Sequence, residues 1–312
     1  MLTMTRLMTT TRSEARAVSG ILLLDKPAGM TSNRVLQRAK RLYRARKAGH
    51  AGTLDPLATG MLPVCFGSAT RVTGMMLGAR KQYRAVVRFG TATSTGDAEG
   101  DVIASCEPCE AIAESTIHEA LTRFRGELDQ VPPMYSALKH EGKRLYELAR
   151  AGKEVPRPPR RICVHQFALE QCCWPEATFY IDCSKGTYVR SLVTDLADAL
   201  GTLAHVAELR RLGVGPFQES QLVTLETLER LAGEGFEALD QRLLGADSAL
   251  VDTLAVTVSA QDALALRQGQ STILAGQGDD VTVRIYDTRG QFVGLGVLGP
   301  SGQLRPSRIF PA

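Results

Sequence analysis

A change of pattern near Thr253 divides the 312-residue sequence into two unlike parts. Before it, short apolar runs alternate with amphipathic helical segments, which is typical of an α+β domain. After it, short Val-rich runs such as 281–285 and 292–297 are separated by Gly and Asp, as in a small β-barrel. We therefore expect a core domain over residues 20–250 and a small β domain over residues 251–312. Residues 1–19, rich in Thr and Arg, are expected to form a disordered tail.

The composition is that of an ordinary soluble protein, with 44% hydrophobic and 22% charged residues. No stretch approaches the roughly 18 apolar residues of a membrane helix, so we expect a cytoplasmic protein with no membrane partner. The seven cysteines are irregularly spaced, which favours reduced thiols, and the lone CxxC of Cys106 and Cys109 favours a loop over a zinc site. Without a Walker-type loop, a dinucleotide fingerprint or clustered metal ligands, neither a metal nor an organic cofactor is expected.

A run of basic residues follows the first predicted strand, Ile21–Leu24. Thr31 or Ser32 can cap the next helix, whose apolar residues recur at helical spacing from Val35 to Leu42. The net charge of +4 does not by itself indicate a partner. A run of one sign is either a solvated face or an anion-binding face, and because like charges repel, we favour contact with nucleic-acid phosphates. The run comprises Arg34, Arg38, Lys40, Arg41, Arg44, Arg46 and Lys47.

The segment 48–63 is dense in Gly and Pro and is expected to be a loop. Asp55 lies within it before a proline, which excludes the α conformation from the preceding residue. Gly49, Gly52 and Gly60 allow the backbone to approach a ligand closely. From these features alone, Asp55 is more simply interpreted as a turn residue than as a catalytic one.

Several motifs together give a more specific interpretation. The segment Gly49–Pro63 resembles the catalytic motif of the bacterial tRNA pseudouridine-55 synthases, the TruB family. The chain after residue 250 resembles, more weakly, the PUA RNA-binding barrel of that family. The resemblance implies a pseudouridine-synthase α+β fold, in which a bent, mainly antiparallel sheet with flanking helices encloses a central cleft. The other motifs, in family order, are Leu23–Ser32, Lys81–Arg84, Val131–Lys139, Ser184–Arg190 and His205–Arg211.

The resemblance also implies the roles of individual residues. Asp55 is expected to be the catalytic aspartate and Arg190 its ion-pair partner. Tyr83 is expected to stack on the target uracil, Tyr188 to lie beside the aspartate, and Leu209 to pack in the pocket wall.

Four further residues are assigned around this centre. His50 is expected to touch the RNA loop and help hold the base extruded. Lys26 and Pro27 are expected to support the active-site loop, and Asp97 to lie at the edge of the pocket. Phosphate contacts are expected from four basic segments: Arg34–Lys47, Lys139–Arg144 (within a predicted helix, Lys139–Arg150), Arg157–Arg161, and Arg210 with Arg211.

The implied reaction isomerises the uridine at position 55 in the T-loop of tRNA to pseudouridine. It breaks the N1–C1′ bond and joins C5 to C1′, so it requires no electron or energy donor. Asp55 can attack C1′ or remove the C2′ proton, and both routes stay open. Either route needs an ionised carboxylate; burial alone would raise the pKa of Asp55, and the Arg190 guanidinium would oppose that rise. We expect Arg190→Ala to abolish activity and leave the fold intact.

We expect a stand-alone, monomeric enzyme that acts on the tRNA T-arm. Three other functions are alternatives to it. A guide-RNA-dependent relative would need protein partners, and the bacterial-type motif spacing argues against it. A non-catalytic RNA-binding or RNA-folding protein would not depend on Asp55. A carboxylate glycosidase would need a second acid facing Asp55, where the motif supplies an arginine.

Overall fold

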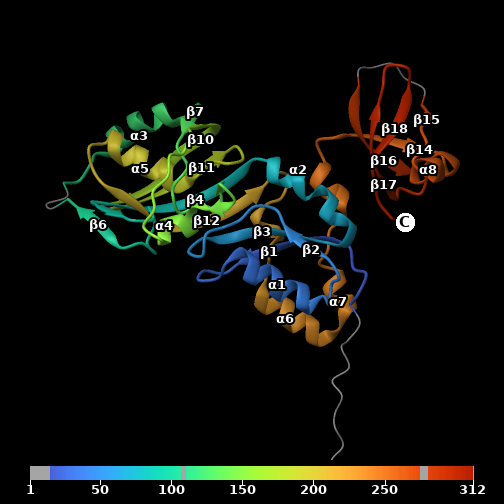
Figure 1. Cartoon of the computed structure of the whole chain (residues 1–312), viewed down its shortest axis with the longest axis horizontal. Helices are drawn as coiled ribbons and strands as arrows, with labels where there is room; N and C mark the ends of the chain where they lie inside the picture. The colour runs from blue at the N-terminus through green and yellow to red at the C-terminus, as the bar shows by residue number, and fades with distance from the viewer. Residues whose placement is uncertain (1–14, 107–109, 275–279, 312) are drawn as a thin grey trace, which may run out of the picture.

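The protein is built around two β-sheets, a large one in the core and a small one near the C-terminus (Figure 1). The computed structural model describes residues 15–106, 110–274 and 280–311. The strands are β1 Gly20–Lys26, β2 Ala48–His50, β3 Thr59–Phe66, β4 Lys81–Phe89, β5 Thr91–Thr93, β6 Val102–Ser105, β7 Gly126–Gln130, β8 Lys139–His140, β9 Lys143–Arg144, β10 Arg160–Cys173, β11 Glu176–Cys183, β12 Ala204–Val214, β13 Val223–Thr224, β14 Leu254–Val258, β15 Thr272–Ile273, β16 Val281–Asp287, β17 Phe292–Leu298 and β18 Gln303–Ile309. The α-helices are α1 Ser32–Leu42, α2 Thr73–Gly78, α3 Glu114–Leu121, α4 Leu145–Arg150, α5 Val189–Ala199, α6 Leu225–Glu234, α7 Phe236–Asp240 and α8 Ala260–Arg267, and the 3-10 helices are Gly67–Val72, Thr122–Phe124, Glu219–Gln221 and Ala246–Leu250.

The core sheet has the order β13-β1-β3-β12-β4-β11-β10-β7, and β2 also pairs with β3. Only the pairs β1–β13 and β3–β12 are parallel, so the sheet is mainly antiparallel, as expected for the α+β fold. β12 pairs with β3 on one side and β4 on the other, and it therefore joins the two halves of the sheet. Helices α1 and α6 lie beside one half, and α3 and α5 beside the other (Figure 1).

Helix α1 forms because its apolar residues, from Val35 to Ala39, face the core while the basic ones face outward. Thr31 caps it, as predicted, by accepting a hydrogen bond from the Arg34 backbone N–H at 3.2 Å. The basic run does not form one helix, however. The helix ends at Leu42, and Arg44 adopts a left-handed backbone conformation with φ of 48°.

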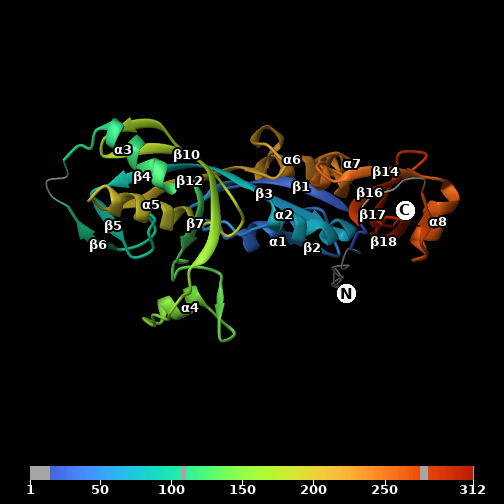
Figure 2. The ribbon, with the colours of Figure 1, turned by 90° about the horizontal axis from the view of Figure 1, so that it is seen from above.

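Two other predicted elements differ in the structure. The expected loop 48–63 contains β2 and the first half of β3, because β1 pairs with β3 along its whole length, from Gly20 opposite Phe66 to Lys26 opposite Gly60. The predicted helix Lys139–Arg150 begins only at Leu145. Its first half is the hairpin β8–β9, whose turn residues Glu141 and Gly142 have φ of 50° and 84°. Figure 2 shows that α4 and this hairpin project from the body of the protein.

Packed structure begins before Gly20, where the tail was expected to end. Val18 is buried, and Arg16 forms a β-bridge with Ala45. The Arg16 guanidinium also pairs with Asp240 at 2.5 Å, which fixes this short segment against α7. The rest of the predicted tail, and Cys109 of the CxxC pair, lie outside the described residues.

The C-terminal sheet has the order β14-β16-β17-β18-β15, an open arrangement that α8 covers on one side. Its own core includes Leu266, Ile285 and Val293. From its other side, Leu295 and Phe310 pack into an apolar cluster of the core domain, so the two parts share a contact. No helix of the described residues is long and apolar enough to span a bilayer.

Candidate active site

A tight turn presents Asp55 in front of the core sheet. The Ala58 backbone N–H donates to the Asp55 carbonyl at 3.1 Å, which closes the turn at Asp-Pro. The preceding residue, Leu54, is tied to α1 because Ser32 Oγ accepts from its N–H at 2.8 Å and donates to its carbonyl at 3.0 Å. The turn and the hydrogen bonds from α1 therefore set the position of the carboxylate.

Lys26 stabilises the same turn through hydrogen bonds to backbone carbonyls. Its fully buried ammonium donates to the carbonyls of Pro27 at 2.8 Å and Pro56 at 3.0 Å. Burial lowers the pKa of Lys26 to about 8, although Glu99 and Asp55 oppose the change. The Pro27 ring itself is exposed, and its contact with the site is through its carbonyl.

Arg190 lies in the first turn of α5, two residues after the N-terminal cap residue Tyr188. Its buried guanidinium places Nη2 2.9 Å from Asp55 Oδ2 and Nε 3.5 Å from Asp97 Oδ2. Nη1 donates to the Thr95 carbonyl and Nη2 to the Tyr135 carbonyl, both at 2.7 Å. One side chain thus connects three segments that are far apart in the sequence.

Several effects of opposite sign act on the pKa of the Asp55 carboxylate. Burial raises its pKa, the Arg190 guanidinium lowers it, and the charge of Asp97 raises it; the net change is upward. The Asp55 side chain is nevertheless 38% exposed, whereas that of Arg190 is 5% exposed. The acid is therefore accessible to a ligand while its cation is fixed behind it.

A cavity of about 300 Å³ opens in front of Asp55. Tyr83 from β4 and Leu209 from β12 line one side of it, and Tyr188 and Arg190 from the start of α5 line another. Five residues that the sequence assigned to one site therefore do lie together. A cavity of this size, lined by apolar and charged side chains, can accept a flat heteroaromatic ring that carries polar groups.

The other predicted residues lie around the cavity rather than in its lining. Asp97 is buried, and its Oδ1 accepts from Thr95 Oγ1 at 2.5 Å and from the Glu99 N–H at 3.1 Å. His50 lies on β2, where burial lowers its pKa and keeps the ring neutral. Among the described residues, none bonds to its buried Nδ1.

The sequence interpretation missed three residues that shape the cavity: Lys81, Gln130 and Ser136. Lys81 Nζ donates to three carbonyls at the end of α2, at 2.6, 2.7 and 3.2 Å. Gln130 brackets the Tyr188 backbone, accepting from its N–H at 2.8 Å and donating to its carbonyl at 3.1 Å. Each of the three lies inside or next to a recognised motif, which is the only signal the sequence offers for them.

The expected phosphate contacts of Arg210 and Arg211 are wrong. Arg210 pairs with Asp25 at 2.8 Å and Glu219 at 2.5 Å, and Arg211 is 1% exposed. Neighbouring residues of a strand point to opposite faces of the sheet; on one face the catalytic loop packs against Arg211, and on the other two acids hold Arg210. Arg161, in another expected segment, is exposed but already paired with acidic residues of β7.

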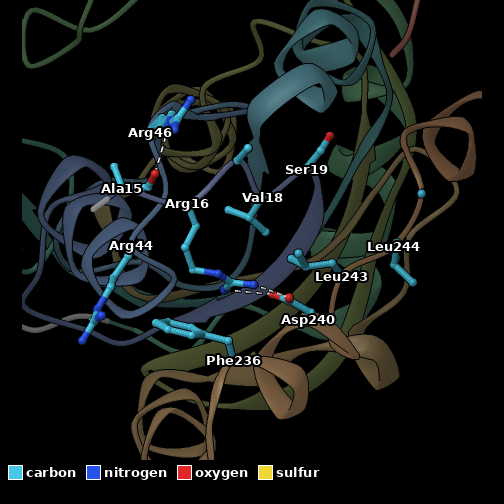
Figure 3. A pocket seen from close by; sticks show the side chains of 12 residues that line it. Ala15, Arg16, Val18, Ser19, Arg44, Arg46, Phe236, Asp240, Leu243 and Leu244 are labelled. Atoms are coloured by element: carbon cyan, nitrogen blue, oxygen red, sulfur yellow. Dashed lines mark hydrogen bonds and ion pairs between the residues drawn. The ribbon is translucent and has the colours of Figure 1, made fainter. Parts of the chain in front are cut away.

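A larger cavity, of about 1010 Å³, lies between the N-terminal segment and α7 (Figure 3). It shares no lining residue with the cavity at Asp55. Its acid, Asp240, is paired with Arg16, whose guanidinium also lies over the Phe236 ring. We therefore assign the chemistry to the smaller cavity, where an acid faces open space. No group of three potential metal ligands occurs in the described part of the chain.

Comparisons with known families cover most of the chain. Residues 40–189 match the TruB family pseudouridylate synthase N-terminal domain, residues 190–251 the tRNA pseudouridylate synthase B C-terminal domain, and residues 255–310 the C-terminal domain of pseudouridine synthase II TruB. The sequence is 47% identical to tRNA pseudouridine synthase B of Pseudomonas aeruginosa (strain UCBPP-PA14), covering 94% of this chain and 96% of that one. It is 44% identical to the protein of that name from Nitrosococcus oceani, over 96% of each chain.

Solved structures with the same fold include Cbf5 in a Cbf5-Nop10-Gar1 complex, with a TM-score of 0.72 and 26% identity over 94% of this chain and 85% of that one. A second is the archaeal box H/ACA Nop10-Cbf5 complex, with a TM-score of 0.69 and 26% identity over 94% and 86% of the two chains. The family expected from the motifs is thus confirmed along nearly the whole sequence. This chain belongs to the TruB family of pseudouridylate synthases.

Proposed function

We propose that this protein isomerises the uridine at position 55 in the T-loop of tRNA to pseudouridine, with Asp55 as the catalytic carboxylate. The observation that carries the proposal is the pair of Asp55 and Arg190, 2.9 Å apart, at a cavity also lined by Tyr83 and Tyr188. Its relatives in Pseudomonas and Nitrosococcus, named tRNA pseudouridine synthase B, support tRNA as the substrate.

The target base has to leave its stack to reach Asp55, because the carboxylate faces a cavity that admits about one base. Unstacking costs a few kcal/mol. Contact of the uracil with Tyr83 offsets this cost, since stacking on an aromatic ring is worth about 1–3 kcal/mol per base. His50 lies at the edge of the same motif and is proposed to contact the RNA loop that the base leaves.

Two chemical routes fit the geometry. In the first, Asp55 attacks C1′ and forms an ester while the N1–C1′ bond breaks. In the second, Asp55 removes the C2′ proton and gives a glycal. Both use an ionised carboxylate, which Arg190 stabilises from a buried position.

We propose that the enzyme acts as a monomer without guide RNA or a protein partner. Its Cbf5 structural relatives were solved in complexes with Nop10 or with Nop10 and Gar1, whereas its more similar bacterial relatives carry tRNA in their names. Conversion of a bare T-arm hairpin by the purified chain separates the two modes, because a guide-dependent enzyme would leave that hairpin unmodified.

Asp97, the acid that shares Arg190 with Asp55, does not supply the second carboxylate of a glycosidase. Asp97 lies close to the pair, but Thr95, Glu99 and Arg190 occupy its oxygens. An inverting or retaining glycosidase needs both carboxylates available to substrate or water.

The experiment compares wild type, Asp55→Asn and a control variant, Asp252→Asn, on an unmodified tRNA transcript, with pseudouridine mapped by position. Asp252 is exposed and distant in sequence from the cavity. We expect modification at the T-loop uridine by wild type and the control, and RNA binding without modification by Asp55→Asn. Turnover by Asp55→Asn at the wild-type rate would refute the catalytic role and leave the RNA-binding alternative.

A further inference from the structure

Arg211 is a buried cation that the site as described does not use. It lies on β12, directly opposite Tyr83 of β4 on one side and Gly60 of β3 on the other. Directly paired residues of antiparallel strands point to the same face of a sheet, so the guanidinium and the tyrosine ring share the face that lines the Asp55 cavity. Although it is 1% exposed, Arg211 therefore belongs to the floor of that cavity.

Its charge has no acidic partner. Nε donates to the Met61 carbonyl at 2.7 Å and Nη2 to the Gly52 carbonyl at 3.0 Å, and both acceptors are neutral. Over residues 15–106, 110–274 and 280–311, no carboxylate oxygen lies within 4.0 Å of this guanidinium. A buried charge without a counter-ion is unfavourable, so a lasting structural role alone explains its presence poorly.

The loop that carries Asp55 closes on this guanidinium. Gly52 has φ of 93°, and a Cβ atom at that position would lie 3.3 Å from Arg211 Nη1. The positive charge is thus fixed between the catalytic loop and Tyr83. Burial raises the pKa of the Tyr83 hydroxyl, and the Arg211 charge opposes that rise. A base stacked on Tyr83 would therefore lie near the Arg211 charge.

The other two cations of the cavity lining, Arg190 and Lys81, each face a negative charge or partial charge. Asp55 and Asp97 pair with Arg190. Lys81 donates to three carbonyls at the C-terminal end of α2, where the helix presents partial negative charge. Arg211 differs from both, because among the described residues neither a carboxylate nor a helix C-terminus faces its guanidinium, and its charge can therefore act on a bound ligand.

The proposed reaction produces a transient anion at this place. When the N1–C1′ bond breaks, its electron pair stays on the uracil, which then carries negative charge over N1, O2 and O4. Asp55 meanwhile gains either the bond to C1′ or the C2′ proton. In the return step, C5 forms the new bond to C1′, Asp55 releases C1′ or returns the proton to C2′, and C5 loses its proton while N1 gains one.

Resting on the function proposed above, we infer that Arg211 stabilises the detached uracil as an anion, and so holds it in the cavity while it turns from N1 to C5. Fixed donors and charges aimed at developing negative charge are effective in a site that excludes water. The 1% exposure of Arg211 and its two backbone hydrogen bonds fix it in this way before substrate binds.

The test varies the leaving group as well as the protein. Full-length wild type, Arg211→Met, Arg211→Lys and the control Arg88→Met are compared in single-turnover reactions on a T-arm hairpin. Arg88 is an exposed residue of β4 paired with Glu176, on the same sheet but away from the cavity lining. The hairpin carries either uridine or 5-fluorouridine at the target, and consumption of the N-glycoside is followed by chromatography of nuclease digests.

With uridine, Arg211→Met should lower the single-turnover rate about 100-fold, the size of effect seen when one fixed electrostatic donor is removed. The RNA Kd should change by less than about twofold, because the charge acts on the anion rather than on bound uridine. With 5-fluorouridine the loss should shrink to about 10-fold or less, since fluorine makes the uracil anion more stable and less dependent on the arginine. Arg211→Lys, which keeps the charge, should recover most of the rate, and Arg88→Met should match wild type.

Equal losses with both leaving groups would overturn the inference, because a damaged loop would slow both reactions alike. A loss that appears only in RNA Kd, or no loss at all, would overturn it too. If Arg211→Met does not fold, Arg211→Lys decides: near-wild-type rates on both hairpins support the inference, and equally reduced rates refute it. Failure of wild type to convert the T-arm uridine would instead refute the proposed function, so the two failures are distinguishable.

Discussion

Replacing Arg190 by methionine tests whether the ion-pair network behind Asp55 stabilises the fold as well as the reaction. The substitution keeps most of the aliphatic volume and removes the charge. It leaves Asp97, which is 4% exposed, without its cation, and it removes the donors to the carbonyls of Thr95 and Tyr135. The expectation that loss of Arg190 leaves the fold intact does not take this burial into account.

The magnitude follows from that burial. Breaking a buried ion pair by removing one partner costs about 3–5 kcal/mol, mainly because the remaining charge stays buried. We expect Arg190→Met to lower the free energy of unfolding by that amount. Adding Asp97→Asn removes the stranded charge, so the double variant should recover about 1–3 kcal/mol relative to the sum of the single changes.

The assay is urea unfolding of all four proteins of the cycle at neutral pH, with free energies obtained by linear extrapolation. Arg84→Met serves as a matched control, because Arg84 pairs with Glu170 at 2.6 Å on the exposed side of β4. An exposed pair of this kind contributes less than about 1 kcal/mol. Additive single effects, or a loss for Arg190→Met no larger than that of the control, would show that the reasoning about the buried network is wrong.

Three further predictions follow from the same site. Because burial raises the pKa of Asp55 and the reaction uses its ionised form, kcat/KM should rise with pH through a pKa above the ordinary value for aspartate; a pH profile that is flat through the acid range contradicts this. Tyr83→Ala should weaken binding of the extruded base by about 1–3 kcal/mol, whereas Tyr83→Phe should keep the RNA Kd, measured by titration of labelled hairpin. Gly60→Ala should destabilise the protein by more than about 1 kcal/mol in urea unfolding, because its φ is 93° and the new Cβ would lie 2.3 Å from the Arg211 carbonyl oxygen; Gly233→Ala in α6, with free space around it, should be neutral or stabilising.

Local patterns predicted the elements that depend on local chemistry. The Thr31 cap and the buried strand β1 both follow from residue type and spacing within a few positions. Local patterns could not show which residues come together to form the site. Asp55 and Arg190 meet only because α5 begins beside the edge of the cavity, and nothing in periodicity connects the two residues. The family motifs supplied that connection.

The errors of the sequence interpretation concern charge. The sequence does not show whether a basic residue faces solvent, pairs with an acid or is buried. Arg210 and Arg211 were expected to bind phosphate, yet one is paired with Asp25 and the other is buried. The deciding fact is what packs on each face of β12, the catalytic loop on Arg211 and Asp25 on Arg210, and these contacts depend on the whole fold. Charge runs therefore indicate partners only after the exposed positions are known.

The environments of the two acids near Arg190 explain why Asp55, rather than Asp97, is suited to react. Oδ1 of Asp97 accepts two hydrogen bonds, its Oδ2 faces Arg190 Nε, and the side chain is 5% exposed. Asp55 uses only Oδ2 in its ion pair, and no described residue donates a hydrogen bond to its Oδ1. With a side chain 38% exposed toward the cavity, Asp55 keeps one oxygen free for C1′ or the C2′ proton of a ribose. Asp97, with both oxygens engaged, instead fixes the guanidinium that opposes the rise in the pKa of Asp55.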